Sequence, residues 1–184
     1  DIGTGVAIIT GETARAENAE QVLAALSTLA GDFVVSTAGP HLESVLAARG
    51  AGLDTYSEHT SAIVANLDIG GGTTNIAAYR QGQLLGTSCI DIGGRLLRVA
   101  DGRITYISHQ LARLARHHGI AVAVGDRVDI ARLRTLAQVM ARQLAMAIGL
   151  VDRDEIHEAL YTNQGHPLSK DLVPGDISFS GGIA

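Results

Sequence analysis

The sequence predicts an α/β fold in which mixed sheets are flanked by helices, and three observations lead to this prediction. Short β-branched runs alternate with helical periods over the first sixty residues, several short strands separated by glycine turns follow, and a long helical period then precedes a last strand. Hydrophobic residues make up 46% and charged residues 18% of the 184 residues. The chain can therefore bury a core, and intrinsic disorder is excluded.

Residues 1–60 have the order strand, helix, strand, helix, which favours a parallel pairing of the two strands. The strands are predicted at residues 6–10 and 33–36, and the helices at residues 13–30 and 41–49. Residues 51–60 are polar and without periodicity, so we expect a connection there. We therefore expect a boundary near residue 60, which divides the chain into a first lobe, residues 1–60, and a second lobe, residues 61–184.

The second lobe begins with strands separated by glycine turns. Strands are predicted at residues 62–68, 75–80, 83–90, 95–99 and 103–108, so that the middle of the chain forms one antiparallel meander. Asp101-Gly102 is the turn between the last two of them. Helices are predicted from Ser108 to the Gly119 stop, from Asp129 to Ile148 and, as a short element, over residues 152–160. A final strand is predicted at residues 176–180.

The strongest chemical signal is the segment Asp-Ile-Gly-Gly-Gly-Thr-Thr-Asn at residues 68–75, between two predicted strands. The glycines leave room for a polyanion, their backbone N–H groups can form a nest around phosphate oxygens, and the threonine hydroxyls can donate to a γ-phosphate. Asp68 is an acceptor suited to Mg²⁺ through water. The candidate phosphate-binding residues are Gly70, Gly71, Gly72, Thr73 and Thr74. The alternative is a plain hairpin turn, although hairpins usually need only two special residues.

Other glycine motifs do not fit this segment, and a second glycine pair gives a weaker signal. A Walker A loop needs a lysine, and a dinucleotide fingerprint needs a helix after the glycines, whereas a strand is predicted here. Gly93 and Gly94 can let the backbone approach a nucleotide, with Arg95 as a cation for phosphate or a planar surface for adenine. The alternative is a bend that packs the two following leucines into the core.

These segments resemble parts of a known superfamily. DIGGGTTN, the later DIGG and the final strand ending in SGG are similar to the phosphate and adenosine loops of the actin, heat-shock chaperone and sugar kinase ATPases. The resemblance implies a partial actin-like ATPase fold, related to ribonuclease H, with ATP and Mg²⁺ as cofactors. It also implies that Asp68 is the catalytic and metal-binding residue, and that Gly181 and Gly182 begin the adenosine loop.

Longer stretches narrow the resemblance. VAIITGETARAENAEQVLAALSTLAGDFVVSTAGPHLES, NLDIGGGTTN and ISFSGGIA are similar to the EutA family of ethanolamine ammonia-lyase reactivating factors, over nearly the whole chain. The resemblance implies an ATP-dependent, chaperone-like factor that exchanges damaged cobalamin for adenosylcobalamin in its partner, ethanolamine ammonia-lyase. Family members are longer, so we expect a fragment that lacks the first phosphate loop and is inactive alone, with weak ATPase activity in the full-length protein. A cytoplasmic location, with association to a bacterial microcompartment, is also implied.

Composition excludes other partners. The net charge of −5 and the single lysine supply no basic stripe, so nucleic acid is not an expected partner. No apolar run reaches membrane-spanning length, and no membrane partner is expected. Cys89 is predicted to be a small buried hydrophobe, and one cysteine favours a cytosolic setting.

Several other residues receive structural interpretations. Asp1, in the opening DIGTG, is interpreted as part of an ordinary loop. His117 and His118 are predicted to form a solvated helix end that complements the helix dipole, rather than a metal site. Ser36 with His41 lacks the third partner of a hydrolase. Arginines at positions 132, 134 and 142 are predicted to lie on a solvated helix face.

Two other function classes remain open. A small-molecule kinase of the same fold would need a catalytic aspartate, for which Asp54 and Asp91 are candidates. A scaffold that has lost nucleotide binding would keep the fold, and Asn75, where many related ATPases carry aspartate, leaves room for it. Titration with Mg-ATP separates the binding classes from the scaffold.

Overall fold

In the computed structural model, the structure describes residues 6–9, 21, 25, 34–37, 39–163 and 165–182. Asp1 and most of the helix predicted at residues 13–30 lie outside these residues. The first two strands are β1 (Val6–Ile9) and β2 (Val34–Thr37), and they pair in parallel with Val6 opposite Val34. The parallel pairing expected from the order of elements is confirmed.

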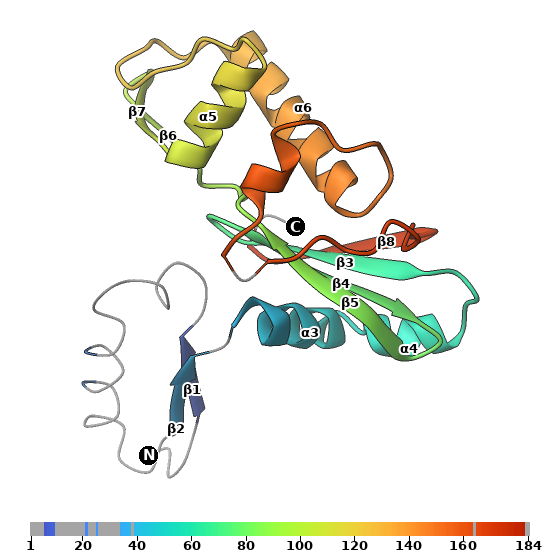
Figure 1. Ribbon diagram of the computed structural model, residues 1–184. Helices are drawn as coiled ribbons and strands as arrows, with labels where there is room; N and C mark the ends of the chain where they lie inside the picture. The colour runs from blue at the N-terminus through green and yellow to red at the C-terminus, as the bar shows by residue number, and fades with distance from the viewer. Residues whose placement is uncertain are drawn as a thin grey trace.

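A four-stranded mixed sheet forms the centre of the molecule (Figure 1). Its strands are β3 (Val64–Ile69), β4 (Thr74–Arg80), β5 (Gln83–Ile90) and β8 (Asp176–Ser180), in the spatial order β5-β4-β3-β8. The first three are antiparallel neighbours joined by tight turns, whereas β8 pairs with β3 in parallel. The last strand in the sequence thereby comes to lie beside the first strand of the sheet.

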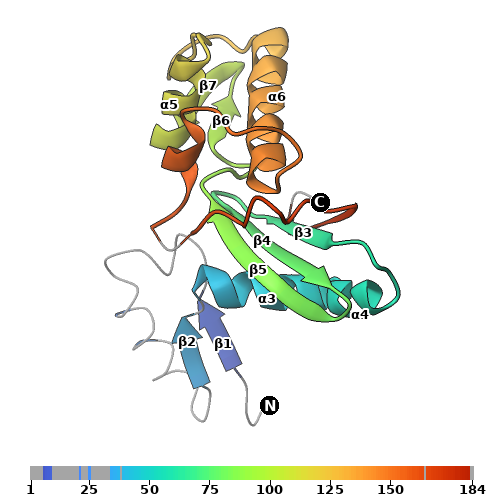
Figure 2. The ribbon, with the colours of Figure 1, turned by 45° about the vertical axis from the view of Figure 1, so that its right-hand side comes forward.

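Helices α3 (Pro40–Gly50) and α4 (Leu53–Glu58) cover one face of this sheet (Figures 1 and 2). Their buried residues Ala48 and Leu53 pack against the sheet residues Val64, Ala77 and Tyr79. Apolar burial therefore holds residues 40–58 to the strands that follow residue 60. The division of the chain into lobes at residue 60 stays a prediction.

The prediction of an irregular connection over residues 51–60 is wrong, because α4 lies there. Six residues are too few to show a helical period. The helix begins after Gly52, which has the left-handed φ of 74°, and buries Leu53 and Ser57 one turn apart. The hydroxyl of Ser57 accepts a hydrogen bond of 2.8 Å from the Gly82 amide in the β4–β5 turn. Tertiary contacts thus stabilise a helix that local sequence does not signal.

The opposite face of the sheet carries the larger core. It packs against α5 (His109–His117), α6 (Ile130–Ala147) and the 3₁₀ helix η1 (His157–Leu160) (Figure 2). Ser108 caps α5 and Asp129 caps α6 by accepting hydrogen bonds from the first helical amides. Both long helices therefore begin near the predicted residues. Of the short helix predicted at 152–160, only residues 157–160 are helical, as η1.

A buried polar chain crosses this half of the molecule. The side chains of Gln143 and His157 are both fully buried. His157 Nδ1 lies 2.7 Å from Gln143 Oε1, and its Nε2 lies 2.9 Å from the hydroxyl of Tyr161. Burial lowers the pKa of His157 below its ordinary value, because a charged imidazole is poorly solvated there. These hydrogen bonds join α6 to η1.

Strands β6 (Leu97–Ala100) and β7 (Arg103–Ile107) form a separate antiparallel pair. The Asp-Gly turn between them is confirmed, with φ values of 50° at Asp101 and 68° at Gly102. The prediction that they continue one meander with the preceding strands is wrong. After β5 the backbone bonds to the glycine turn instead of the sheet: the Gly94 amide donates to the Gly70 carbonyl at 3.0 Å.

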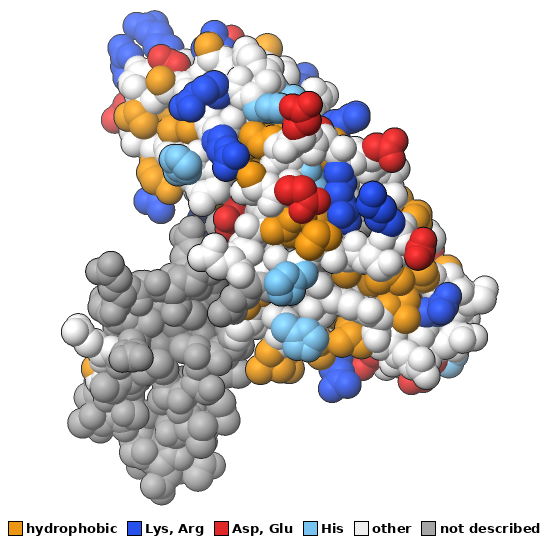
Figure 3. Space-filling model, viewed as in Figure 1, with side chains coloured by type: hydrophobic (Ala, Val, Ile, Leu, Met, Phe, Trp, Pro, Cys, Tyr) orange, Lys and Arg blue, Asp and Glu red, His pale blue; other side chains and the backbone are white. Residues whose placement is uncertain are grey.

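The visible surface over α5 and α6 mixes charges of both signs, with no continuous basic stripe on this face (Figure 3). The arginines at positions 132, 134 and 142 are exposed on α6, as predicted. Among the described residues, no helix combines the length and apolar character needed to cross a membrane.

Candidate functional site

The glycine run closes the β3–β4 hairpin and presents unused backbone donors. Ile69 and Thr74 are the last paired residues, and the Gly70 amide donates to the Thr73 carbonyl at 2.9 Å. Within the described part of the chain, no backbone acceptor is recorded for the next three amides, at residues 71–73. Three successive N–H groups of this kind can surround an anion. The hairpin is thus a turn and also a candidate anion site.

The glycines of the turn are not needed for a left-handed backbone conformation. Gly70, Gly71 and Gly72 are absent from the residues with positive φ. A Cβ placed on Gly71 would lie 3.5 Å from the Cδ atom of Arg95, which is an ordinary contact. A side chain larger than methyl would press against the Arg95 side chain. The advantage of glycine at this point is an open approach to the backbone.

Gly93 and Gly94 lie directly against the glycine turn. The Gly94 amide donates to the Gly70 carbonyl at 3.0 Å, and the Arg95 amide donates to the Gly71 carbonyl at 2.7 Å. A Cβ on Gly93 would lie 2.6 Å from the Gly71 carbonyl oxygen, so only glycine permits this approach. The two glycine segments, about twenty residues apart in sequence, form one surface, and Arg95 brings a cation to it.

The predicted aspartate lies at the same edge of the sheet. Asp68 pairs with Ser180 of β8, whose hydroxyl donates to Asp68 Oδ1 at 3.0 Å. Gly181 has φ 94°, and a Cβ on it would lie 2.9 Å from that oxygen. Gly181 is therefore held beside Asp68, at the end of β3 that leads into the glycine turn. At Gly182, a Cβ would meet no described atom within 4 Å.

A line of polar side chains orients the aspartate. Ser178 Oγ donates to Asn66 Oδ1 at 3.1 Å, and Asn66 Nδ2 donates to Ser180 Oγ at 2.9 Å. Ser180 in turn donates to Asp68. Alternate residues of two parallel neighbours share one face, which places all four side chains in a row. The carboxylate is held in position, and its second oxygen has no hydrogen bond among the described residues.

The two threonines have different roles. Thr74 Oγ1 donates to the Ile92 carbonyl at 2.6 Å, which ties the hairpin to the segment before Gly93. No hydrogen bond engages the hydroxyl of Thr73 within the portion of the chain described. Thr73 is therefore the threonine with a hydroxyl available to a ligand, whereas that of Thr74 is committed to the fold.

Sequence reasoning missed Glu43, which α3 brings to this face of the sheet. Asn75 Nδ2 donates to Glu43 Oε2 at 2.9 Å, although the two residues are 32 positions apart. Asn75 Oδ1 is buried, and no partner for it lies among the described residues. Asn75 alternates with Ala77 and Tyr79 along β4, and this spacing could have indicated the face of the sheet on which Asn75 lies. No local signal indicates that Glu43 is its partner.

The other residues singled out in the sequence lie at different distances from the glycine turn. Asp54 lies in α4, with its Oδ2 3.6 Å from Arg49 Nε, and Ser57 of the same helix accepts a hydrogen bond from the β4–β5 turn at the other end of β4. It is therefore remote from the glycine turn along the sheet. Asp91 immediately follows β5, and its amide donates to the Leu160 carbonyl at 2.7 Å. Cys89 is buried, as predicted. Nothing is described of the Ser36 side chain.

These features define an α/β protein that presents the donors of a glycine turn, an oriented carboxylate and two further glycine segments at one edge of a mixed sheet. The chain belongs to the EutA family: all of residues 1–184 match the family described as ethanolamine utilisation protein EutA. The resemblance inferred from the sequence is confirmed. The mixed sheet with helices on both faces agrees with the α/β arrangement that was expected from the sequence.

Two curated relatives are ethanolamine ammonia-lyase reactivases named EutA. The Salmonella typhimurium protein is 40% identical and the Escherichia coli protein 38% identical, each over 99% of this chain. The chain spans 38% of the length of either relative. Among solved structures, the ethanolamine utilization protein EutJ from Carboxydothermus hydrogenoformans is 19% identical with a TM-score of 0.39, covering 96% of this chain and 51% of that one.

Proposed function

We propose that the protein carrying this chain reactivates ethanolamine ammonia-lyase, with Mg-ATP bound at the glycine turn as its switch. The observation that supports nucleotide binding best is the row of three amides at residues 71–73 with no backbone acceptor recorded among the described residues. They lie in a turn whose glycines leave the backbone open. Successive N–H groups without a backbone partner are donors of the kind that bind phosphate oxygens.

The residues around the turn also fit a metal-bound nucleotide. The free oxygen of Asp68 can accept hydrogen bonds from water on Mg²⁺, and the Ser180 hydroxyl keeps the carboxylate in that orientation. The Arg95 side chain lies beside Gly71 and can offset phosphate charge. Mg-ATP would supply the charge and the cleavable phosphoanhydride bond. The chain's own part is to bind and orient, which is most of what phosphoryl transfer requires.

Gly181 and Gly182 extend the proposed site on the β8 side. Because Gly181 and Ser180 contact Asp68, a change in the position of β8 would also move the Asp68 carboxylate. Nucleotide binding would favour one arrangement of these segments, and loss of the terminal phosphate would release it. Among the described residues, we identify no general base for the attacking water.

The partner follows from family membership and from the names of the relatives. We infer ethanolamine ammonia-lyase as the partner and the exchange of damaged cobalamin for adenosylcobalamin as the outcome. A cytoplasmic location with association to a bacterial microcompartment belongs to the same proposal. Of the two candidate aspartates of the rival kinase function, Asp54 lies away from the glycine turn and is paired with Arg49. Asp91 lies two residues before Gly93 and stays a candidate.

Calorimetric titration of the purified protein with Mg-ATP tests the proposal. Gly71→Val places a branched side chain against Arg95 beside the turn. It should weaken binding at least about tenfold, or about 1.4 kcal/mol. Gly50→Val is the matched control, because Gly50 also lacks a positive φ and a Cβ there meets no atom within 4 Å. It should leave the affinity unchanged. If both variants bound Mg-ATP equally well, the glycines would serve only to form the turn. If the parent protein bound no Mg-ATP, the alternative of a scaffold that has lost nucleotide binding would be favoured.

Reactivation is measured separately. Ethanolamine ammonia-lyase inactivated with a cobalamin analogue should regain activity when the protein, Mg-ATP and adenosylcobalamin are added together. Nucleotide binding without recovery of the lyase would leave the site in place but contradict the proposed partner.

A further inference from the structure

The end of α5 holds two adjacent histidines in fixed positions. The helix ends at His117, and His118 is its C-cap. Gly119 has φ 66°, its amide donates to the Arg116 carbonyl at 3.1 Å, and the Ile120 amide donates to the Ala115 carbonyl at 2.8 Å. This is a Schellman termination, which fixes the backbone that carries both imidazoles.

A carboxylate from the segment before η1 lies beside these histidines. One ligand atom each from His117, His118 and Asp154 lie within 4.8 Å of one another. His118 is only partly accessible, so the prediction of a solvated helix end holds for the exposed His117 but is wrong for His118. The imidazole rings of the two histidines are nearly perpendicular, with centroids 5.0 Å apart.

The spacing between His118 and Asp154 distinguishes two explanations. His118 Nε2 is buried and has no hydrogen-bond partner in the described part of the chain, and it lies 3.7 Å from Asp154 Oδ2. A direct hydrogen bond would bring the atoms to about 2.9 Å. A tetrahedral metal with bonds of about 2.0–2.1 Å would separate them by about 3.3 Å. The observed spacing is nearer to that of two ligands around an ion.

Buried residues fix the orientation of the carboxylate. Gln143 Nε2 donates to Asp154 Oδ2 at 2.8 Å, and the His157 amide donates to Asp154 Oδ1 at 3.0 Å. The amide of Gln143 is itself fixed by His157 Nδ1 at 2.7 Å. Metal ligands in proteins are characteristically held by such outer hydrogen bonds. The aspartate therefore has the support that a metal ligand needs, from two elements other than the one that carries the histidines.

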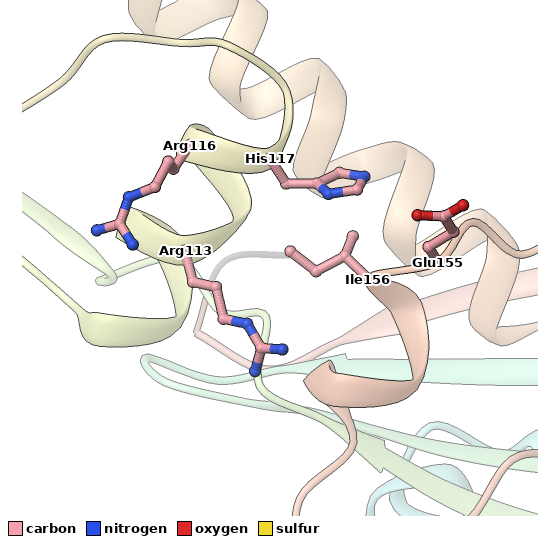
Figure 4. A pocket seen from close by; sticks show the side chains of 5 residues that line it. All are labelled: Arg113, Arg116, His117, Glu155 and Ile156. Carbon is pink, nitrogen blue, oxygen red and sulfur yellow. The ribbon is translucent and has the colours of Figure 1, made fainter.

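His117 also borders a surface hollow of about 340 Å³ (Figure 4). Its imidazole extends toward the side of the hollow where Glu155 lies, whereas Arg113 and Arg116 line the opposite side (Figure 4). The two arginines oppose a bound cation. Asp154, Glu155 and the negative end of the α5 dipole favour it. The hollow opens the His117 side of the cluster to solvent.

We propose that His117, His118 and Asp154 bind a divalent transition-metal ion of the zinc type. Imidazole nitrogen and carboxylate oxygen are the ligands that zinc accepts, and water from the hollow completes the coordination. The ion would join the end of α5 to the segment before η1. Its role is structural, and it is separate from the magnesium proposed beside Asp68.

Metal binding to the purified protein tests this site without any measurement of activity. After treatment with a chelator and its removal, the protein is titrated with Zn²⁺ alone by calorimetry, and with Co²⁺ alone by visible absorption. We expect one ion per chain. At about a hundredfold excess over the dissociation constant, Zn²⁺ should raise the melting temperature by about 5–10 °C.

Three variants and one control locate the ion. His117→Ala, His118→Ala and Asp154→Asn should each weaken Zn²⁺ binding at least about tenfold, and His117 is exposed enough that its replacement leaves folding intact. His109→Ala, at the exposed first residue of α5, should bind Zn²⁺ as the parent does. Absence of saturable binding in the parent, or parental affinity in His117→Ala and His118→Ala, would overturn the proposal.

Discussion

Replacement of Gly93 by alanine directly tests the contact between the two glycine segments. A methyl group there would lie 2.6 Å from the Gly71 carbonyl oxygen and 2.6 Å from the Gly72 carbonyl carbon. Ordinary contacts begin at 3.4 Å, so the two backbones must separate by about 0.8 Å at the oxygen. Neither neighbour is the end of a flexible side chain, and the turn itself must therefore move.

The size of the effect follows from the bonds that this movement breaks. The amides of Gly94 and Arg95 donate to the turn at 3.0 and 2.7 Å. Two hydrogen bonds at about 0.5–1.5 kcal/mol each, with strain of about 1–3 kcal/mol, give a loss of about 2–6 kcal/mol. For a chain of this size that corresponds to a fall in melting temperature of about 4–24 °C. The Mg-ATP affinity should fall as well, because the amides of the turn are displaced.

Thermal unfolding and calorimetric titration of the same preparation measure both effects. Gly50→Ala serves as the control, since a Cβ at Gly50 meets no atom within 4 Å. If Gly93→Ala kept the parental melting temperature and nucleotide affinity, the close approach of the two segments would be refuted, and with it the placement of Gly93 in the site.

Three further predictions concern separate parts of the chain. Asp68→Ala should reduce the Mg²⁺-dependent part of ATP affinity at least about tenfold, measured by titration with and without Mg²⁺, with little change in folding; equal Mg²⁺ dependence in variant and parent would remove Asp68 from the site. Ser57→Ala should lower the free energy of unfolding by about 1–3 kcal/mol in urea denaturation, because the Gly82 amide loses its acceptor; an unchanged midpoint would contradict the role given to this contact. Gln143→Leu should weaken Zn²⁺ binding by about 10–100-fold through Asp154, and parental affinity would show that the carboxylate needs no such support.

The sequence by itself determined the features that depend on neighbouring residues. The strands β3 and β4, the glycine turn between β4 and β5, the turn at Asp101-Gly102 and the stop at Gly119 all depend on local backbone preferences. The structure has them close to where they were predicted. The glycine run with Asp68 before it was likewise identifiable, because the chemistry of a candidate anion turn is carried by consecutive residues. The family was inferred from the resemblance of several longer stretches of consecutive residues.

Only the tertiary structure decided which of these segments meet. It brought Gly93 and Gly181 to the glycine turn, placed Glu43 against Asn75, and formed α4 where the local sequence lacks a helical signal. It also set Asp154 beside His118, 36 positions away in sequence, and so changed a predicted solvated helix end into a candidate metal site. These contacts depend on apolar burial on both faces of the sheet, which is summed over residues far apart in the chain, and no local pattern encodes that sum.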